Sequence, residues 1–264
     1  MAGWIPYTFL QKQNNTNRRV VSGQVTTYKK SPTNSKYVVP DQVYAWESAT
    51  RVSSYSPIVI NGSNNGVTFN SNQKARISSM SYDQYGNIEA VSKTNDVVVS
   101  YKWGYNNSLP IAEITNALAK NVFYTSFEEE VSNFSFGGKT GNKSSANAVY
   151  SKALSGLDPG DYVLAYYKFI SPAWVYTETP AVVPANGLYT ISLPTGQYDE
   201  IRFYPKTAQV KTFTYDPIVG IKTETDANGI TTFYDYDSLS RLKLIRDNND
   251  HILKTYEYHY KLMN

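Results

Sequence analysis

The chain has 264 residues, a formal net charge of +3 and no cysteine, and only 18% of its residues are charged. The lack of cysteine excludes disulfide bonds and thiolate metal sites. Lysine and arginine are scattered rather than gathered in one stripe, which argues against a nucleic-acid-binding protein. The 24 tyrosines stand out. Because tyrosine, threonine and valine favour strands while asparagine, glycine, serine and aspartate supply turns, we expect an all-β protein.

The composition also bears on the location of the protein. No apolar run reaches the roughly 18 residues that a membrane helix needs, and residues 1–6 lack the charged and apolar regions of a signal peptide. The first residues read like the interior of a longer sequence. We therefore expect a fragment of a larger polypeptide, without a membrane span.

Residues 1–120 are predicted to form short strands joined by polar turns. The stretch 110–120 has helix propensity, but an isolated helix of that length is marginal in water, so we favour a strand over Ile111–Thr115 followed by a linker. The other strands expected in this region are 19–28, a strand pair over 37–46 around Pro40-Asp41, and 76–82, 88–93 and 97–103.

Residues 121–210 have fewer tyrosines and a different pattern. A long polar loop over 137–145 and a turn at 158–161 separate short strands. The strands expected here are 162–167, 174–177, 188–193 and 200–204. Short strands at regular spacing favour a β-sandwich, and we interpret the region as a sandwich domain inserted into the surrounding strands.

Residues 211–264 contain a tyrosine-rich repeat. Tyr215-Asp216 and Tyr236-Asp237 are 21 residues apart, and the third copy is Tyr256-Glu257-Tyr258, with a strand expected over residues 256–260. Reversals are expected at 226–229, 237–240 and 247–250, and a weaker copy occupies 82–88. A fixed period indicates repeated supersecondary units that bury one another. The last strand would leave an open sheet edge.

The stretch Thr212–Gly220, continued to Tyr260, resembles the YD-repeat (RHS-like) proteins, and within them the large secreted or surface proteins of Bacteroidetes. Two further stretches are similar to segments of those proteins: Tyr101–Ile114 and Asp199–Pro205. The family usually has glycine before Arg-Leu, whereas this chain has Ser240-Arg241-Leu242. The resemblance implies an exported protein whose repeats wind into a β-rich spiral or shell, which in some relatives encloses a toxin.

The middle region resembles the galactose-binding-like jelly rolls found as carbohydrate-binding modules. The likeness lies in Phe127-Glu128, Gly141–Ser144, Pro159–Tyr162 and Asp199–Arg202. This resemblance implies a structural calcium ion held by Glu128 and Asp199, since calcium prefers hard oxygen ligands. The run 128–130 also fits a solvated acidic face, and no other cofactor is expected.

A glycan site needs aromatic platforms for sugar faces and polar groups for hydroxyls. This chemistry is available in six residues of the middle region, although the aromatic ones equally fit a sandwich core. The candidate glycan-binding residues are Trp174, Tyr176, Tyr166, Tyr167, Asn142 and Asn186.

No set of residues has the spacing of a catalytic centre. The two histidines, His251 and His259, have no acid–base partner at a recognisable spacing. Residues 137–141 mimic a phosphate loop without its full spacing. Asp237-Ser238-Leu239 fits a short acceptor pattern for bacterial O-glycosylation, and also a plain turn. We expect no enzyme.

The sequence therefore predicts three regions: a strand-rich YD-like region over 1–120, a galactose-binding-like β-sandwich over 121–210, and YD-repeat hairpins over 211–264. The favoured function is a non-catalytic scaffold of an exported, secreted or cell-surface protein, whose partner is a surface glycan or another cell-envelope protein. One alternative is a carbohydrate-binding adhesin module. Another is the shell of a toxin-delivery protein without its toxin.

Overall fold

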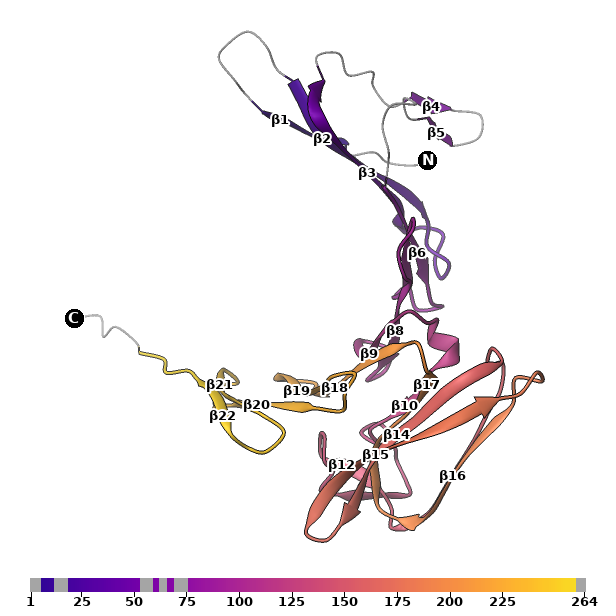
Figure 1. Ribbon diagram of the computed structural model, residues 1–264. Coiled ribbons are helices and arrows are strands. Elements are labelled where there is room, and N and C mark those ends of the chain that lie inside the picture. The colour runs from indigo at the N-terminus through magenta and orange to yellow at the C-terminus, as the bar shows by residue number, and fades with distance from the viewer. Residues whose placement is uncertain (1–5, 12–18, 53–58, 62–65, 69–75, 260–264) are drawn as a thin grey trace. The chain divides into compact units, whose positions relative to one another are not determined.

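The structure is a computed structural model that describes residues 6–11, 19–52, 59–61, 66–68 and 76–259 (Figure 1). The fold is all-β, as expected, and the strand pairs are antiparallel. The helix in the described residues is a single 3₁₀ turn, η1 (Ala119–Asn121). Residues 1–98 and 99–264 form two compact units, which are described separately.

In the first unit, five strands form an antiparallel sheet in the order β1-β2-β3-β6-β7, and two more form a small hairpin. The sheet strands are β1 (Pro6–Gln11), β2 (Arg19–Lys30), β3 (Val38–Val52), β6 (Arg76–Tyr82) and β7 (Ile88–Lys93). The expected strand pair around Pro40-Asp41 is wrong, because β3 passes through these residues as one strand that pairs with β2 on both sides of them. The hairpin strands are β4 (Val59–Asn61) and β5 (Gly66–Thr68).

In the second unit, seven strands form a meander that we call the array. Its order is β8-β9-β18-β19-β20-β21-β22. The strands are β8 (Val99–Gly104), β9 (Leu109–Thr115), β18 (Gln209–Asp216), β19 (Gly220–Thr225), β20 (Thr231–Tyr236), β21 (Leu242–Arg246) and β22 (Ile252–Thr255).

The middle region is inserted between two neighbouring strands of the array. Strands β9 and β18 pair directly, with Thr115 opposite Gln209 and Ala112 opposite Thr212. Residues 116–208 therefore leave the sheet after β9 and return to it at β18. This topology agrees with the expected insertion, and the preference for a strand rather than a helix at Ile111–Thr115 is confirmed.

We call the inserted region the insert. It contains a larger sheet with the strand order β10-β17-β14-β15, a two-stranded sheet β13-β16 that faces it, and a small hairpin β11-β12. This arrangement is sandwich-like, as expected. The strands of the larger sheet are β10 (Phe123–Thr125), β14 (Gly160–Ile170), β15 (Ala173–Val183) and β17 (Tyr198–Pro205). The others are β11 (Phe134–Phe136), β12 (Lys143–Ser145), β13 (Ala148–Leu154) and β16 (Tyr189–Gly196).

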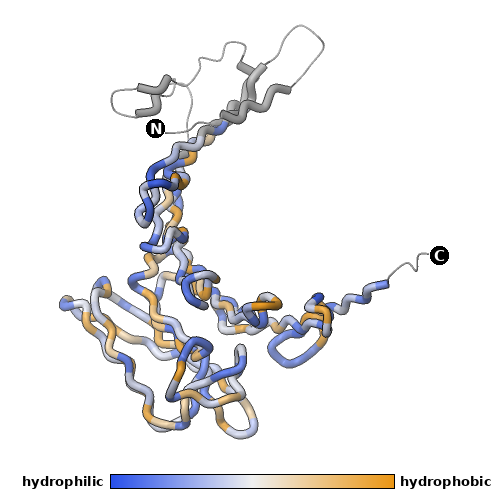
Figure 2. The backbone as a smooth tube through the Cα atoms, turned by 180° about the vertical axis from the view of Figure 1, so that it is seen from behind, coloured by the Kyte–Doolittle hydropathy of each residue, from blue (hydrophilic) through white to orange (hydrophobic). Residues whose placement is uncertain are grey.

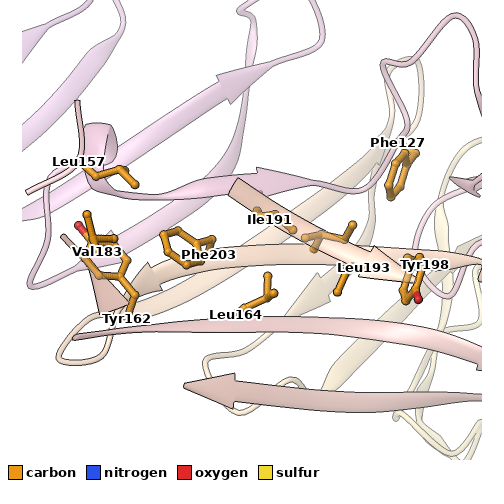
Figure 3. Close-up of a cluster of buried hydrophobic side chains, with 10 residues drawn as sticks. Phe127, Leu157, Tyr162, Leu164, Val183, Ile191, Leu193, Tyr198 and Phe203 are labelled. Carbon is orange, nitrogen blue, oxygen red and sulfur yellow. The ribbon is translucent and has the colours of Figure 1, made fainter. Parts of the chain in front are cut away.

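The core of the insert lies between the two facing sheets (Figure 3). The Phe203 ring stacks between Tyr162 at 4.9 Å and Tyr189 at 4.4 Å, measured between ring centroids. Ile191 of β16 and Leu164 of β14 are buried in the same cluster. Burial of each such side chain contributes roughly 1.5–3 kcal/mol, so this cluster is the main apolar core of the insert.

A second apolar cluster packs the opposite face of the larger sheet against the array. It joins Ala165 of β14 and Tyr204 of β17 to Ile114 of β9 and Val210 of β18. Strand β17 therefore has neighbours on both faces, and its residues 198–204 are all buried. Figure 2 shows apolar segments along strands of the insert and hydrophilic segments at many turns.

Four of the hairpin turns share one geometry, which explains the aspartate at the start of each of them. The Oδ1 atom of the first residue accepts hydrogen bonds from the amides two and four positions later, and the fourth residue has a positive φ. The turns begin at Asp83, Asp226, Asp237 and Asp247. The residues with positive φ are Gly86, Gly229, Ser240 and Asp250.

The recurring tyrosine also has one role. Its hydroxyl donates a hydrogen bond of 2.7–2.9 Å to a backbone carbonyl of an earlier strand, so each ring ties its own segment of the chain to that strand. The pairs are Tyr82 with Pro40, Tyr215 with Pro110, Tyr236 with Ile221, and Tyr258 with Leu242.

The third repeat departs from the expected strand at residues 256–260. Strand β22 ends at Thr255, although Tyr256 still donates its amide to the Lys243 carbonyl. The turn at 247–251 places the strand at Ile252–Thr255, and β22 is the last strand in the sheet order. The predicted strand over 256–259 is therefore wrong, and residue 260 lies outside the described residues.

Candidate functional site

The predicted glycan-binding aromatics lie on both faces of the larger sheet of the insert. Tyr167 and Tyr176 are register partners with ring centroids 5.2 Å apart. Trp174 lies on the same face of the sheet, and its ring centroid is 5.3 Å from that of Phe169. Tyr166 points to the other face, where its ring meets Tyr198. The structure thus brings three of the four aromatic residues together.

The shared face of these aromatics is partly covered by turns of the array. The Tyr167 hydroxyl donates to the Gly229 carbonyl and to Asn248 Oδ1, the latter at 3.2 Å. A Cβ added to Gly229 would lie 2.4 Å from the Tyr176 ring. Tyr167 is buried, whereas Tyr176 and Trp174 are half-buried. Two of the proposed platforms therefore also serve as the surface on which the array docks.

The two predicted asparagines lie elsewhere. Asn142 is exposed and accepts a hydrogen bond from Lys222 of the array through its Oδ1. Asn186 is exposed and accepts the amide of Leu188, 3.1 Å away, within its own turn. Neither has a hydrogen bond to the aromatic group in the described residues, and the glycan site stays a prediction.

Glu128, the first predicted calcium ligand, holds the loop over residues 137–143. Its Oε1 accepts the amides of Asn142 at 2.7 Å and Lys143 at 2.6 Å. Burial raises the pKa of Glu128, although these amides and Lys222 oppose the shift. One carboxylate oxygen is thus committed to backbone donors, so Glu128 fits a calcium site poorly.

Asp199, the second predicted ligand, is fully buried and holds the same loop at a different point. Its Oδ2 accepts the Thr140 amide at 2.7 Å. Oxygens of Asp199, Thr140 and Lys143 lie 2.0–2.8 Å from an ideal Cβ built on Gly138. A carboxylate and two carbonyls are ligands that calcium accepts. Asp199 therefore fits a cation in part, and calcium stays a prediction.

The sequence reasoning missed a buried polar cluster at the centre of the second unit. Glu200, 1% exposed, accepts hydrogen bonds from Tyr124 at 2.9 Å, from Thr140 at 3.2 Å, and from Thr212. Arg202, 0% exposed, forms an ion pair with Glu200 at 3.2 Å. Acidic and basic residues inside the aromatic strand 198–205 were the signal that could have revealed it.

The buried cluster joins the insert to the array. Arg202 Nη1 donates to the carbonyl of Val210 in β18, at 3.2 Å, and to the carbonyl of Asp226 in the turn between β19 and β20, at 2.7 Å. Burial and the adjacent Glu200 carboxylate raise the pKa of Asp199 well above its usual range, although the Thr140 amide opposes the shift. Breaking a buried charge pair is strongly destabilising, so this cluster fixes the two parts together.

Residues 137–141, which mimic a phosphate loop, also contact the array. Lys139 Nζ donates to the Asn248 carbonyl at 3.2 Å. The same ammonium lies 5.0 Å from the Phe233 ring centroid and 5.5 Å from that of Tyr167. Its role in the structure is therefore to hold the loop on the array.

The histidines lie near single carboxylates. His251 Nδ1 is 3.1 Å from Asp247, and His259 Nε2 is 3.5 Å from Glu257, both at exposed positions. Within the described ranges, no group of three or more histidine, aspartate or glutamate side chains could hold a metal ion. The described part of the chain also has no helix with the length and apolar character of a membrane span.

Comparison with protein-family models and with curated protein sequences gave no match.

Proposed function

We propose that this chain is a non-catalytic scaffold segment of an exported cell-surface protein of the YD-repeat type. The repeated tyrosine and aspartate contacts support this, because Tyr215 and Tyr236 each tie their strand to an earlier one and the turns at Asp226 and Asp237 share one geometry. An array built this way provides a surface for spacing or display. Its partner would be a surface glycan or another cell-envelope protein.

The observation that carries the proposal is the buried cluster of Glu200 and Arg202. It joins the insert to strand β18 and to the turn that begins at Asp226. A binding domain that moves independently would need only a linker to the array. The aromatic face of the insert is used in the same way, since Tyr167 and Tyr176 contact array turns. These contacts are those of a rigid spacer.

A pulling experiment on the full chain tests the scaffold role. Stretched between its ends, the wild-type chain should unfold residues 99–264 as one unit. The Arg202→Met variant should release the insert in a separate, earlier step. An insert that already unfolds separately at low force in the wild type would contradict the proposal. Antibody labelling of intact producing cells would test exposure at the cell surface.

The second candidate function is carbohydrate binding by the insert. The observation in its favour is the end of the β14–β15 hairpin, where Trp174 is half-buried beside the exposed side chains Phe169 and Val175. Exposed apolar residues at one place can mark an interaction site. Such a site would use Trp174 and would not need the covered ring of Tyr167.

A glycan array followed by calorimetry on the full chain separates the two functions. A glycan site predicts saturable binding that is lost in Trp174→Ala and retained in Tyr85→Ala, a matched control whose tyrosine is 59% exposed in a turn of the first unit. Absence of binding by a folded wild-type chain favours the scaffold. Repeating the titration with calcium and with a chelator tests whether Asp199 and its neighbouring carbonyls hold a cation.

A further inference from the structure

A pocket of about 190 Å³ lies where the start of the insert meets the β8–β9 hairpin. Its walls include the aromatic rings of Tyr105, Phe123, Phe127 and Tyr150. Small-molecule sites commonly combine apolar and aromatic walls with a few polar groups. This pocket is separate from the aromatic face around Trp174 and from Asp199.

The polar groups of the pocket are mostly acidic. Glu128, Glu129 and Glu130 line it together with one basic residue, Lys152. The Glu129 and Glu130 side chains have no hydrogen bond or ion pair among the described residues, whereas Glu128 holds the 137–143 loop. Two carboxylates thus remain available to a ligand, and the excess negative charge favours a cation.

The chain itself shows which kind of cation the pocket accepts. Lys152 Nζ lies 5.7 Å from the centroid of the Phe123 ring, within the range of a cation–π contact. An ammonium group on an aliphatic stem therefore already lies against an aromatic ring on the wall of this pocket. A metal ion fits less well, since the described residues contain no group of three ligating side chains.

We propose that this pocket binds the primary ammonium group of a lysine side chain presented by a partner protein. The aliphatic stem packs between Phe123 and Tyr150, and the ammonium reaches the carboxylates of Glu129 and Glu130. Lys152 competes for the same space and charge. This binding site goes beyond the proposed scaffold role and does not depend on it.

Titration of the full chain with Nα-acetyl-lysine methylamide, followed by NMR chemical shifts, tests the proposal. We expect weak saturable binding that disappears with the Nε-acetylated analogue, which has the same stem and no charge. Glu129→Gln and Glu130→Gln should each weaken binding roughly 2–5-fold, the range of partly exposed ion pairs. Glu89→Gln, at an exposed carboxylate outside the pocket, is the matched control and should bind like the wild type.

Lys152→Met gives the sharpest outcome, because it removes the internal competitor and should tighten binding several-fold. A role of Lys152 that is only structural predicts no gain. The proposal is overturned by no saturable binding, by equal binding of the neutral analogue, or by weaker binding in Lys152→Met. Tighter binding of glucosamine than of the lysine probe would also overturn it and assign the pocket to an amino sugar.

Discussion

At the scale of single residues, one turn position carries backbone strain. Ser240 adopts φ +60° at the position where two of the equivalent turns have Gly86 and Gly229 and the third has Asp250. The turn keeps its hydrogen bonds, because Asp237 Oδ1 still accepts the Leu239 amide at 2.9 Å. Serine therefore stands where two other turns have glycine, and the turn geometry is still present.

We predict that Ser240→Gly stabilises the chain by about 0.5–1 kcal/mol, because glycine adopts positive φ without the Cβ clash. Denaturant unfolding measures the change. Ser238→Gly in the same turn has no positive φ to relieve, so it should be neutral or destabilising. Equal effects of the two variants would contradict the backbone explanation.

Glu128 supplies a prediction about pH. Its folded-state pKa is raised by burial, so folding favours its protonated form. The stabilising contribution is fully present below the ordinary pKa of 4.5 and is lost as pH rises through the raised value.

The Glu128→Gln variant keeps an acceptor for the amides of Asn142 and Lys143 but cannot ionise. Its stability should therefore change less with pH than that of the wild type above pH 4.5. Urea titrations from pH 4 to 8 measure this difference. Glu89→Gln is the exposed control, and identical pH profiles for Glu128→Gln and the wild type would contradict the prediction.

At the scale of elements, β17 decides how the insert is held. It is the strand with apolar residues on one face, such as Phe203, and the ionic residue Arg202 on the other. The Glu200 backbone has φ +55°, and the pairing of β14 with β17 shifts register between Ala165 and Tyr167. This bulge re-aims the side chains so that Glu200 reaches Tyr124 and Arg202.

Arg202→Met should lower the free energy of unfolding by about 3–5 kcal/mol, because Glu200 would be left as an unpaired buried charge. The double variant Glu200→Gln/Arg202→Met should be more stable than the sum of the single variants predicts, since neither charge remains. A double-mutant cycle in urea measures this coupling. Strict additivity would show that Glu200 and Arg202 do not stabilise each other.

At the scale of the whole molecule, the second unit depends on array turns packing against the insert. Gly229 combines a positive φ of 77° with contact to Tyr176, and Asn248 of the later turn accepts from Tyr167. The 21-residue period separates the turns that begin at Asp226 and Asp247, and both turns reach the same face of the larger sheet of the insert.

Gly229→Ala should therefore break this docking as well as strain the turn. Gly156→Ala is a matched control, because Gly156 has a similar φ of 74° and no atom within 4 Å of an added Cβ. We expect Gly229→Ala to lower the free energy of unfolding by about 1–3 kcal/mol more than Gly156→Ala does, which is the usual range for overpacking. Hydrogen exchange should also become faster around Tyr176 in that variant alone.

The sequence by itself determined the strand content, the turn positions and the insertion. These features depend on local chemistry: aspartate and a left-handed residue make each turn, and alternating apolar residues make each strand. The strand over 256–259 was mispredicted because its periodic pattern does not show whether a partner strand is present. A strand needs that partner for its backbone hydrogen bonds; β21 pairs with Ile252–Thr255 and beyond them accepts the amide of Tyr256.

The tertiary structure alone decided which side chains meet. Tyr166 and Tyr167 are adjacent in sequence, yet a strand sends them to opposite faces, and only the packing shows that array turns contact Tyr167. The link from Arg202 to the Asp226 carbonyl spans 24 residues. The charge pattern shows that Glu200 and Arg202 need partners once buried, but only packing on both faces of β17 buries them and supplies those partners.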